Sequence, residues 1–468
     1  MMIQLRALRS SLLLAQPNNR GQERLRRAGL TGVTSMISQG LIIASGLISI
    51  PLTLNYLGRE RYGVWLTMNS LLSWLTISNL GFAGNALINS LAEATGKDDR
   101  ELARELVATA FWSLMGIAAL LSFVFALAFP FIPWPAVFNT ASTVPLSELH
   151  WAVILSLMSF VLMFPISIAD AIYQGYQEGY IGNGWGMAGS LLSLVALLGV
   201  THIQGGLPLL VFALSSVRIL VAIINIAYLF KRRYPWLLPV PQAVTRRSLR
   251  RLTSLGSKYL VAQLAGIGMF QSQPMIIVQV LGPVQVGIFN IAQRLLTLPL
   301  MVVQMFTFPL MPAYGEAQAR QDWPWIRRTL QRSLIISAVA SLCMVVPLMF
   351  LAKAVVRLWV GWEMVPDQAL ILALSLYVLV AAVVTPASVM LYGLERVGGQ
   401  ALIAIANAVV TVIAGIWLTR ILGLPGMAGA MAIALVGVNL IGQAIQAWLV
   451  LNSPQVGCVR EYKKQPAL

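Results

Sequence analysis

The stretch Leu54–Glu93, LNYLGRERYGVWLTMNSLLSWLTISNLGFAGNALINSLAE, indicates how this chain is built. It ends one apolar segment, turns at Leu57-Gly58 and enters a second apolar segment near Gly63. The second segment carries a series of small polar residues: Asn69, Ser70, Ser73, Thr76, Ser78, Asn79, Asn85 and Asn89. Polar side chains at membrane depth are costly and tend to mark substrate or ion pathways. The pattern therefore predicts a membrane helix with a polar stripe.

The same turn recurs in the second half of the chain. Leu281-Gly282 and Gly287 repeat the spacing Leu-Gly, four residues, Gly that begins at Leu57. A register shared by two distant segments indicates an internal duplication.

The composition is that of a polytopic membrane protein. Of 468 residues, 58% are apolar and 10% are charged, whereas soluble domains carry about 25% charged residues. The net charge of +16 comes from basic residues scattered between apolar segments rather than gathered on one polar domain. This distribution argues against nucleic acid as a partner and is better explained by membrane topology.

A spanning helix needs about 20 mostly apolar residues, and this criterion predicts twelve spans. They are 30–56, 63–91, 104–129, 149–174, 181–203, 207–230, 257–281, 285–314, 328–352, 367–392, 399–421 and 425–451. With the N-terminus inside, 25 of the 32 Lys and Arg residues fall on the inner side. The positive-inside rule then predicts that both termini are cytoplasmic, in a cell inner membrane.

The predicted spans divide into two lobes of six helices, 30–230 and 257–452. A basic cytoplasmic leader, 1–29, precedes them, a basic linker, 231–256, joins them, and a cytoplasmic tail, 453–468, follows. The linker's arginines alternate with apolar residues at helical spacing, which predicts an amphipathic helix on anionic inner-leaflet lipids; a solvated charge run is the alternative. An even number of helices per half predicts two parallel repeats around a central cavity, a transporter architecture that works by alternating access.

Arg294 is the most informative candidate site residue. It lies well inside its span beside Asn290 and Gln293, so it needs an anionic substrate or a structural partner. Arg218 is equally deep, and either lines the cavity or pairs with Asp170. Further cavity candidates are the amides Gln271, Gln39, Asn69 and Asn79, for which interhelical hydrogen bonding is the alternative role.

Asp170 is the candidate for coupling transport to H⁺ or Na⁺, because it is the one carboxylate predicted well inside a span. A simple helix-end charge is the alternative. Two cysteines and two histidines give no spacing for a metal site, and no cofactor site or catalytic constellation is apparent. The chain is therefore predicted not to be an enzyme. Several prolines fall inside spans and predict kinks: Pro51, Pro165, Pro274, Pro299, Pro309, Pro347 and Pro386.

Several motifs together resemble one family. They are LNYLGRERYGVWL at 54–66, NLGF at 79–82, LAE at 91–93, YGLER at 392–396 and GLPGMAGA at 423–430. Over residues 30–452 the chain resembles polysaccharide and oligosaccharide flippases, which include O-antigen and lipid II flippases. They belong to the multidrug/oligosaccharidyl-lipid/polysaccharide exporter superfamily. Asn79 is a departure, since members often carry an aspartate there, and proton coupling through this position is in doubt.

The resemblance implies a two-lobed transporter that moves a polyprenyl-pyrophosphate-linked oligosaccharide from the inner to the outer leaflet, for cell-surface polysaccharide assembly. Arg294 and Arg218 would bind the pyrophosphate and the amides would bind sugar hydroxyls. The implied partners are this lipid-linked oligosaccharide, H⁺ or Na⁺, and polysaccharide polymerase machinery.

Three alternatives remain open at the level of sequence. A cation-coupled multidrug exporter of the same fold would use a buried carboxylate, and the two intramembrane arginines argue against it. A membrane-embedded glycosyltransferase or polymerase would usually show acidic catalytic residues in a large loop, but the longest predicted outer loop has only Glu148. A scaffold that binds lipid-linked intermediates without moving them is the third.

Overall fold

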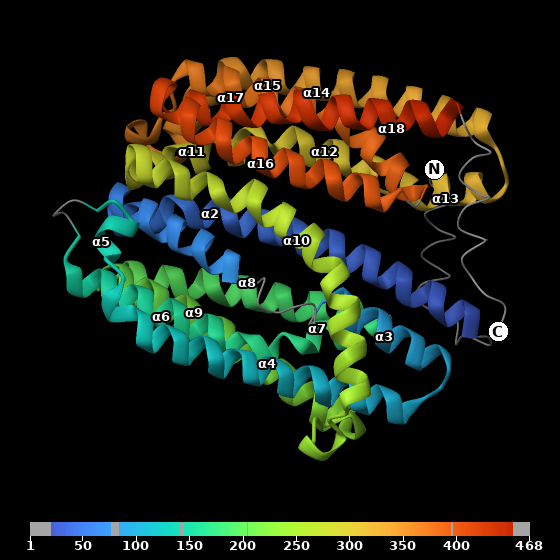
Figure 1. Cartoon of the computed structure of the whole chain (residues 1–468). Helices are drawn as coiled ribbons and strands as arrows, with labels where there is room; N and C mark the ends of the chain where they lie inside the picture. Colours follow the sequence, from blue (N-terminus) through green and yellow to red (C-terminus); the bar gives the residue numbers. More distant parts are fainter. Residues whose placement is uncertain (1–19, 76–83, 141–143, 204, 395, 453–468) are drawn as a thin grey trace. The chain divides into compact units, whose positions relative to one another are not determined.

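The computed structural model describes residues 20–75, 84–140, 144–203, 205–394 and 396–452, and every regular element in these ranges is a helix (Figure 1). The first half contains α2 (Arg20–Leu75), α3 (Asn85–Gly96), α4 (Arg100–Ala128), η2 (Phe129–Phe131), α5 (Trp134–Val137), α6 (Leu146–Ile166), α7 (Ile168–Gly175), α8 (Gly179–Thr201) and α9 (Gly206–Tyr228). The short elements η3 (Leu229–Arg233), η4 (Pro235–Leu237) and η5 (Pro241–Ala243) follow.

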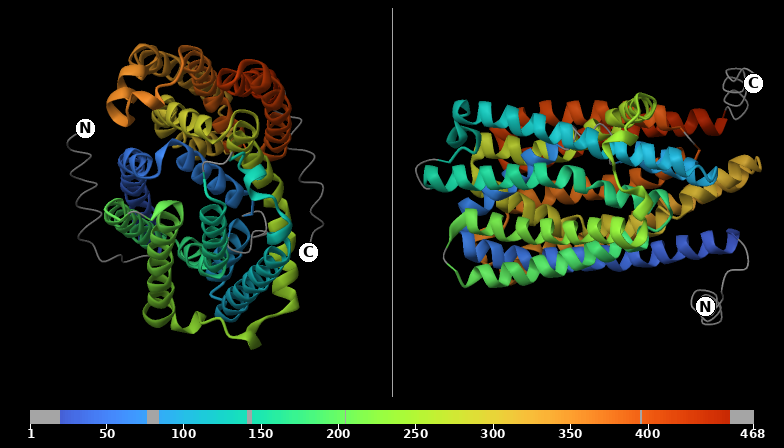
Figure 2. Two further views of the ribbon diagram at one scale, coloured as in Figure 1. Left: turned by 90° about the vertical axis from the view of Figure 1, so that its left-hand side faces the viewer. Right: turned by 90° about the horizontal axis from the view of Figure 1, so that it is seen from below.

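The second half starts with α10 (Arg246–Leu281). After it come α11 (Pro283–Leu296), α12 (Leu298–Thr307), α13 (Leu310–Ala319), α14 (Trp323–Val360), η6 (Trp362–Met364), α15 (Gln368–Gly393), α16 (Val397–Leu422), α17 (Leu424–Ala434), η7 (Leu435–Leu440) and α18 (Ile441–Asn452). The long helices of each half run along a common direction (Figure 2).

Nine of the described helical segments are long and apolar enough to cross a membrane, and the bent pair α11 and α12 brings the number to ten. The remaining two of the twelve predicted spans are the polar ones. Span 63–91 contains residues 76–83, outside the described ranges, and span 257–281 belongs to α10, which begins with a run of arginines. Residues 63–75 of the first of these spans continue the counted segment Ile37–Leu75. The prediction of an all-α polytopic membrane protein is confirmed.

The chain forms two compact units. Unit 1 is Met1–Arg61 with Leu72–Leu260, and unit 2 is Tyr62–Leu71 with Val261–Leu468. In unit 1, a cluster of buried apolar residues from α3, α4 and α7 forms the core, with Leu106 and Ile172 fully buried. In unit 2, α13, α14 and α15 contribute a smaller cluster around Tyr314 and Ile326. The units do not follow a single cut in the sequence, because part of α2 belongs to unit 2.

The duplicated turn has the same backbone geometry in both halves. Gly58 interrupts α2 with φ 74° and ψ 172°, and Gly282 precedes α11 with φ 91° and ψ 169°. No heavy atom would lie within 4 Å of a Cβ at either position. The positive φ, which L-residues with a side chain rarely adopt, is therefore the reason for glycine at both turns.

Just after these turns, α2 and α11 approach backbone to backbone within unit 2. A Cβ added to Gly63 would lie 1.7 Å from the carbonyl oxygen of Pro283, and one added to Gly287 would lie 3.1 Å from a ring carbon of Tyr62. Tyr62 is itself 1% exposed. Gly63 and Gly287, the second glycines of the two motifs, therefore lie where the part of α2 after Gly58 packs against the start of α11.

The linker after α9 is anchored within unit 1 by a buried carboxylate, Glu178. Glu178, which is fully buried, accepts hydrogen bonds from Arg233 and from the hydroxyl of Tyr234, the latter at 2.9 Å. Tyr234 stacks on Tyr176 with ring centroids 4.6 Å apart, and burial raises the pKa of Tyr176 to about 12. The linker is thus held against α7 and α8.

The basic run at 246–251 is helical and forms the first turns of α10 without a break. Its Ser248 donates to Glu105 of α4 at 3.1 Å, and its Arg251 forms an ion pair with Glu93 of α3. A hydrogen bond from Lys97 and the charge of Arg251 hold the pKa of Glu93 below its usual range. Part of the basic run therefore binds acidic side chains of unit 1.

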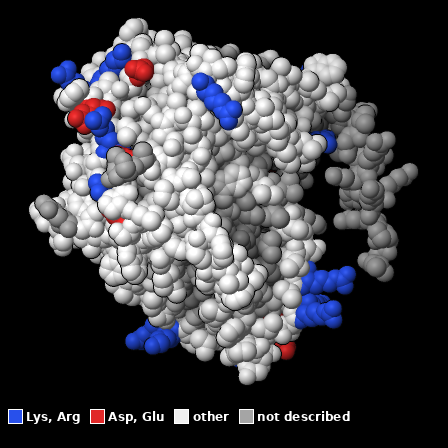
Figure 3. Space-filling model, turned by 60° about the vertical axis from the view of Figure 1, so that its left-hand side comes forward, with Lys and Arg blue, Asp and Glu red and all other residues white. Residues whose placement is uncertain are grey.

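Charged side chains are unevenly distributed over the surface. On the face drawn in Figure 3, lysines and arginines gather near the margins and most of the surface between them is uncharged. This is the distribution expected when apolar helix faces contact lipid and charged residues lie toward water.

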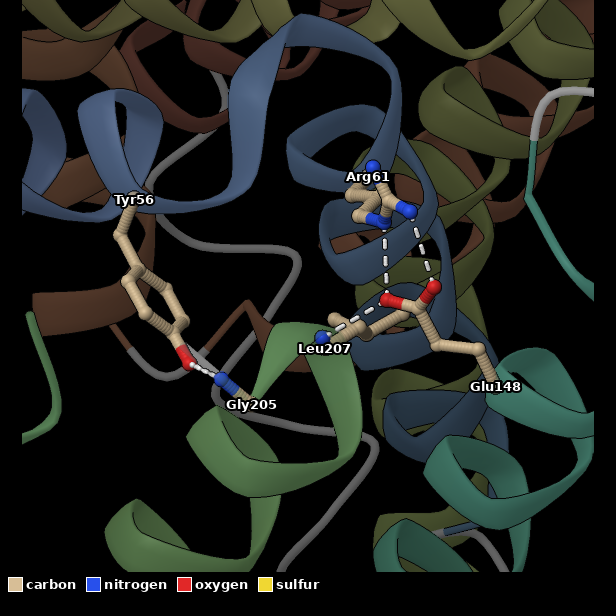
Figure 4. A network of polar contacts seen from close by, with 5 residues as sticks. All are labelled: Tyr56, Arg61, Glu148, Gly205 and Leu207. Atoms are coloured by element: carbon tan, nitrogen blue, oxygen red, sulfur yellow. Dashed lines mark hydrogen bonds and ion pairs between the residues drawn. The ribbon is translucent and has the colours of Figure 1, made fainter. Parts of the chain in front are cut away.

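At the opposite ends of the unit 1 helices from the linker, Glu148 joins three segments (Figure 4). Its carboxylate accepts from Nε and Nη2 of Arg61 at 2.8 and 2.9 Å, and from the backbone N–H of Leu207 at 2.9 Å. A Cβ on the neighbouring Gly206, which has φ 64°, would lie 2.6 Å from Oε1 of Glu148. Nearby, the N–H of Gly205 donates to the Tyr56 hydroxyl at 3.1 Å. The start of α6, the start of α9 and the turn in α2 are thus fixed to one another.

Replacing Gly63 with alanine should destabilise the protein, because the new methyl group overlaps the backbone of Pro283. We expect a loss of about 1–3 kcal/mol, as for other overpacked sites, measured as a lower melting temperature in detergent. Gly116→Ala in α4 is the matched control: its Cβ would meet nothing within 4 Å, so it should be neutral or stabilising. Equal melting temperatures for the two variants would contradict the close approach.

A double-mutant cycle with Arg61→Gln and Glu148→Gln should give a coupling energy of about 1 kcal/mol, since the pair is bidentate and partly buried. Chemical unfolding of the four proteins in micelles measures it. The control cycle uses Arg320 and Glu316, an exposed pair one helical turn apart, which should couple more weakly. Coupling no larger than in the control cycle would mean that the Glu148 network contributes little to stability.

Candidate functional site

The first two helices of the second half form a polar contact at membrane depth. Nε2 of Gln293 in α11 donates to Oε1 of Gln273 in α10 at 3.0 Å. Gln273 is 1% exposed and Gln293 is half-buried. A buried amide needs such a partner, because leaving it unpaired costs about 1–3 kcal/mol. This pair therefore joins α10 to α11, which is the interhelical role that the sequence left open for the amides.

Arg294 is the next residue along α11 and is also half-buried. Over the described part of the chain, its guanidinium makes no hydrogen bond or ion pair. Asn290, half-buried one turn earlier, shares its helix face. The second half of α11 thus presents a cation and an amide that can bind an anion bearing hydroxyl groups.

The other predicted amides have different surroundings. Gln271 is half-buried in α10, two residues before the Gln273 contact. Asn69, in the part of α2 that belongs to unit 2, donates to the Trp65 carbonyl at 2.8 Å. Gln39 is exposed on α2, and Asn79 lies outside the described residues. That these amides line one cavity stays a prediction.

Arg218 and Asp170 both belong to unit 1. Arg218 lies in α9 and Asp170 in α7, and both are exposed. No ion pair joins them, and neither side chain has another hydrogen-bond or ion-pair partner among the residues described. Oδ1 of Asp170 would lie 3.2 Å from a Cβ on Gly182 of α8, so the absence of a side chain there leaves room for the carboxylate. The predicted Asp170–Arg218 pair is thus not seen, and each charge is available for another role.

Sequence reasoning missed several polar contacts between helices. Nδ2 of Asn183 in α8 donates to the hydroxyls of Thr34 and Ser35 in α2 at 3.2 and 2.8 Å. The Tyr173 hydroxyl donates to Oδ1 of Asn225 in α9 at 2.8 Å. Asn183 lies in the glycine-rich segment 179–189, where absent side chains let helices approach, and this was the available signal.

Unit 2 contains two further amide groups that the sequence did not single out. Gln443 donates to the hydroxyl of Ser388 and to Gln400, and Gln400 donates to Gln446, all within 3.3 Å. Asn407 donates to Asn439 at 2.6 Å. Oε1 of Gln443 is buried without a hydrogen-bond partner. The hydrogen bonds that are formed join helices of unit 2, which is the packing role that amides often have in membrane proteins.

Metal-binding chemistry has no support among the described residues. They hold no group of three or more His, Cys, Asp or Glu side chains arranged to bind a metal ion. Cys343, in α14, is exposed and unbridged.

Comparison with solved structures shows the fold. The chain is similar to an inward-facing multidrug resistance MATE family transporter of the MOP superfamily, with a TM-score of 0.76 and 14% identity, covering 92% of this chain and 99% of that one. It is also similar to the lipid II flippase MurJ in an inward closed conformation, with a TM-score of 0.69 and 14% identity, covering 94% of each chain.

Sequence comparison gives a more specific result. A candidate O-antigen transporter of Salmonella typhi is 22% identical over 314 residues, which are 67% of this chain and 70% of the relative. These proteins are described as transporters and a flippase, in agreement with the prediction that the chain is not an enzyme. A family model described as polysaccharide biosynthesis protein matches residues 30–318, well over half of the chain. The chain is therefore a multi-pass membrane protein that belongs to the polysaccharide biosynthesis protein family, as its motifs predicted.

Proposed function

We propose that this protein is a flippase that moves a polyprenyl-pyrophosphate-linked oligosaccharide from the inner to the outer leaflet of the cytoplasmic membrane. The family, the O-antigen transporter relative and the flippase fold support this substrate class. In this proposal both termini are cytoplasmic, the protein works by alternating access, and the oligosaccharide is later joined to others by a polysaccharide polymerase.

The single observation that carries the proposal is the state of Arg294. The cost of a cation at membrane depth is offset by an anionic partner or by water, and the described residues supply no carboxylate to this guanidinium. A pyrophosphate offers oxygens that a guanidinium binds in a bidentate manner. Asn290 on the same face is suited to sugar hydroxyls, Gln293 and Gln271 lie close by in sequence, and Arg218 would add a second cation from unit 1.

The cation-coupled multidrug exporter is the second candidate, favoured by the similarity to a multidrug transporter of this fold. Such a transporter needs a carboxylate for its cationic substrate, and Asp170 is the available acid in the span Leu146–Gly175. The cationic face of α11 suits an anionic substrate better, so we place the flippase first.

Arg294→Gln should reduce transport by about tenfold or more, because one hydrogen bond to a charged group contributes about 1.5–3 kcal/mol. A leaflet-resolved assay of lipid-linked oligosaccharides in cells measures this as accumulation on the inner leaflet, with membrane abundance checked in parallel. Arg294→Lys should retain part of the activity, and Arg420→Gln, at an exposed site in α16, should retain all of it. Loss of folded protein would instead indicate a structural role for Arg294. An unchanged pool with altered resistance to cationic compounds would favour the exporter.

For ion coupling, we propose Asp170 as the group that binds H⁺ or Na⁺. Asp170→Asn should then make transport independent of the imposed ion gradient, measured in vesicles of this protein with gradients of H⁺ and Na⁺ applied separately. If transport by Asp170→Asn depended on either gradient as strongly as transport by the wild type does, Asp170 would be only a helix-end charge.

A further inference from the structure

A groove of about 650 Å³ runs along the outside of unit 1. Helix α6 forms its floor, since it packs against both α4 and α9, and α4 and α9 form the walls. Small residues leave the space between the walls: Ala118 and Ala119 on α4 and Ala227 on α9. Apart from one lysine and one serine, the lining is apolar.

The linker closes one end of this groove. Leu238 and Pro239 belong to the lining, and Nε1 of Trp112 in α4 donates to the Pro239 carbonyl at 3.3 Å. The other sides remain open, because Leu162 and Ile223 in the lining are 51% and 48% exposed. In a membrane protein of this fold, the open sides of the groove are therefore accessible to the surrounding lipid.

Lys231 lies at the closed end and is the charged residue of the lining. Its side chain is exposed, and it has no hydrogen-bond or ion-pair partner within the described ranges. The neighbouring Arg233 differs, because Glu178 neutralises it. Within the lining, an ammonium group with no partner among the described residues thus lies at the linker end of an apolar channel.

The length of the groove matches one leaflet. Its lining on α4 extends from Phe111 to Ser122, which is about 16 Å at 1.5 Å per residue. Half of a hydrocarbon core of about 30 Å is about the same length. An acyl chain in the groove would therefore reach from the Lys231 level to about the bilayer centre.

We propose that this groove is a binding site for one anionic phospholipid of the leaflet that faces the linker. An acyl chain fills the space over α6, and the ammonium group of Lys231 binds the phosphate. The apolar lining, the leaflet-length channel and the ammonium group of Lys231 at its linker end support this occupant. The site lies entirely within unit 1 and does not depend on the proposed flippase activity.

Native mass spectrometry of the full chain tests the site, with phosphatidylglycerol or phosphatidylcholine added to the micelles. The wild type should retain one phosphatidylglycerol more tightly than phosphatidylcholine. Lys231→Gln should weaken the phosphatidylglycerol complex about fivefold, since one basic residue near anionic lipid contributes about 1 kcal/mol. Lys353→Gln, at an exposed lysine of α14, should change nothing.

A second pair of variants tests the apolar part. Ala119→Trp fills the groove and should abolish retention of both lipids, whereas Leu120→Trp, at the adjacent exposed position outside the lining, should not. Equal retention of the two lipids by the wild type would overturn the proposal. So would wild-type retention of phosphatidylglycerol by both Lys231→Gln and Ala119→Trp. So would a co-purifying polyprenyl lipid or peptide that phosphatidylglycerol cannot displace, since it would identify another occupant.

Discussion

The contact between Gly63 and Pro283 constrains much of the structure around it. At this point the start of α11 meets α2 so closely that a single methyl group would collide with a carbonyl oxygen. The turns at Gly58 and Gly282 bring the chain into this position with matching positive φ values. Together they set where Thr67 and Ser70 of α2 and Asn290 and Arg294 of α11 lie along unit 2. The positions of the polar residues in both duplicated segments therefore depend on one close contact between α2 and α11, which requires glycine at position 63.

Sequence patterns predicted the features that depend on local chemistry. Hydropathy predicted a helical membrane protein, and the Leu-Gly spacing predicted a duplicated turn whose two copies share one backbone conformation. Some prolines also had the predicted effect: α12 and α13 begin next to Pro299 and Pro309, where span 285–314 breaks. Pro51 and Pro274 instead lie inside continuous helices. A single proline removes only one backbone hydrogen bond, so neighbouring packing decides the outcome.

The candidate site was harder to predict, because a polar residue in a membrane helix has two roles with the same sequence signature. Gln273 and Gln293 satisfy each other across two helices, and so do Asn407 and Asn439. Which amides meet depends on packing between helices, and single-helix periodicity does not contain that information. Arginines are more informative, since a guanidinium has several donors and a full charge to compensate. This difference is why Arg294 stands apart from the amides around it.

The division of α2 between the two compact units has a consequence for biogenesis. Residues Tyr62–Leu71 emerge early in translation but belong to unit 2, whose other helices begin at Val261. Tyr62, Val64 and Thr67 are almost fully buried there. Until α11 has been inserted, this segment lacks the neighbours in unit 2 that Gly63 and Tyr62 meet in the complete chain. A first half made without the second would thus lack the residues that complete the unit to which Tyr62–Leu71 belong.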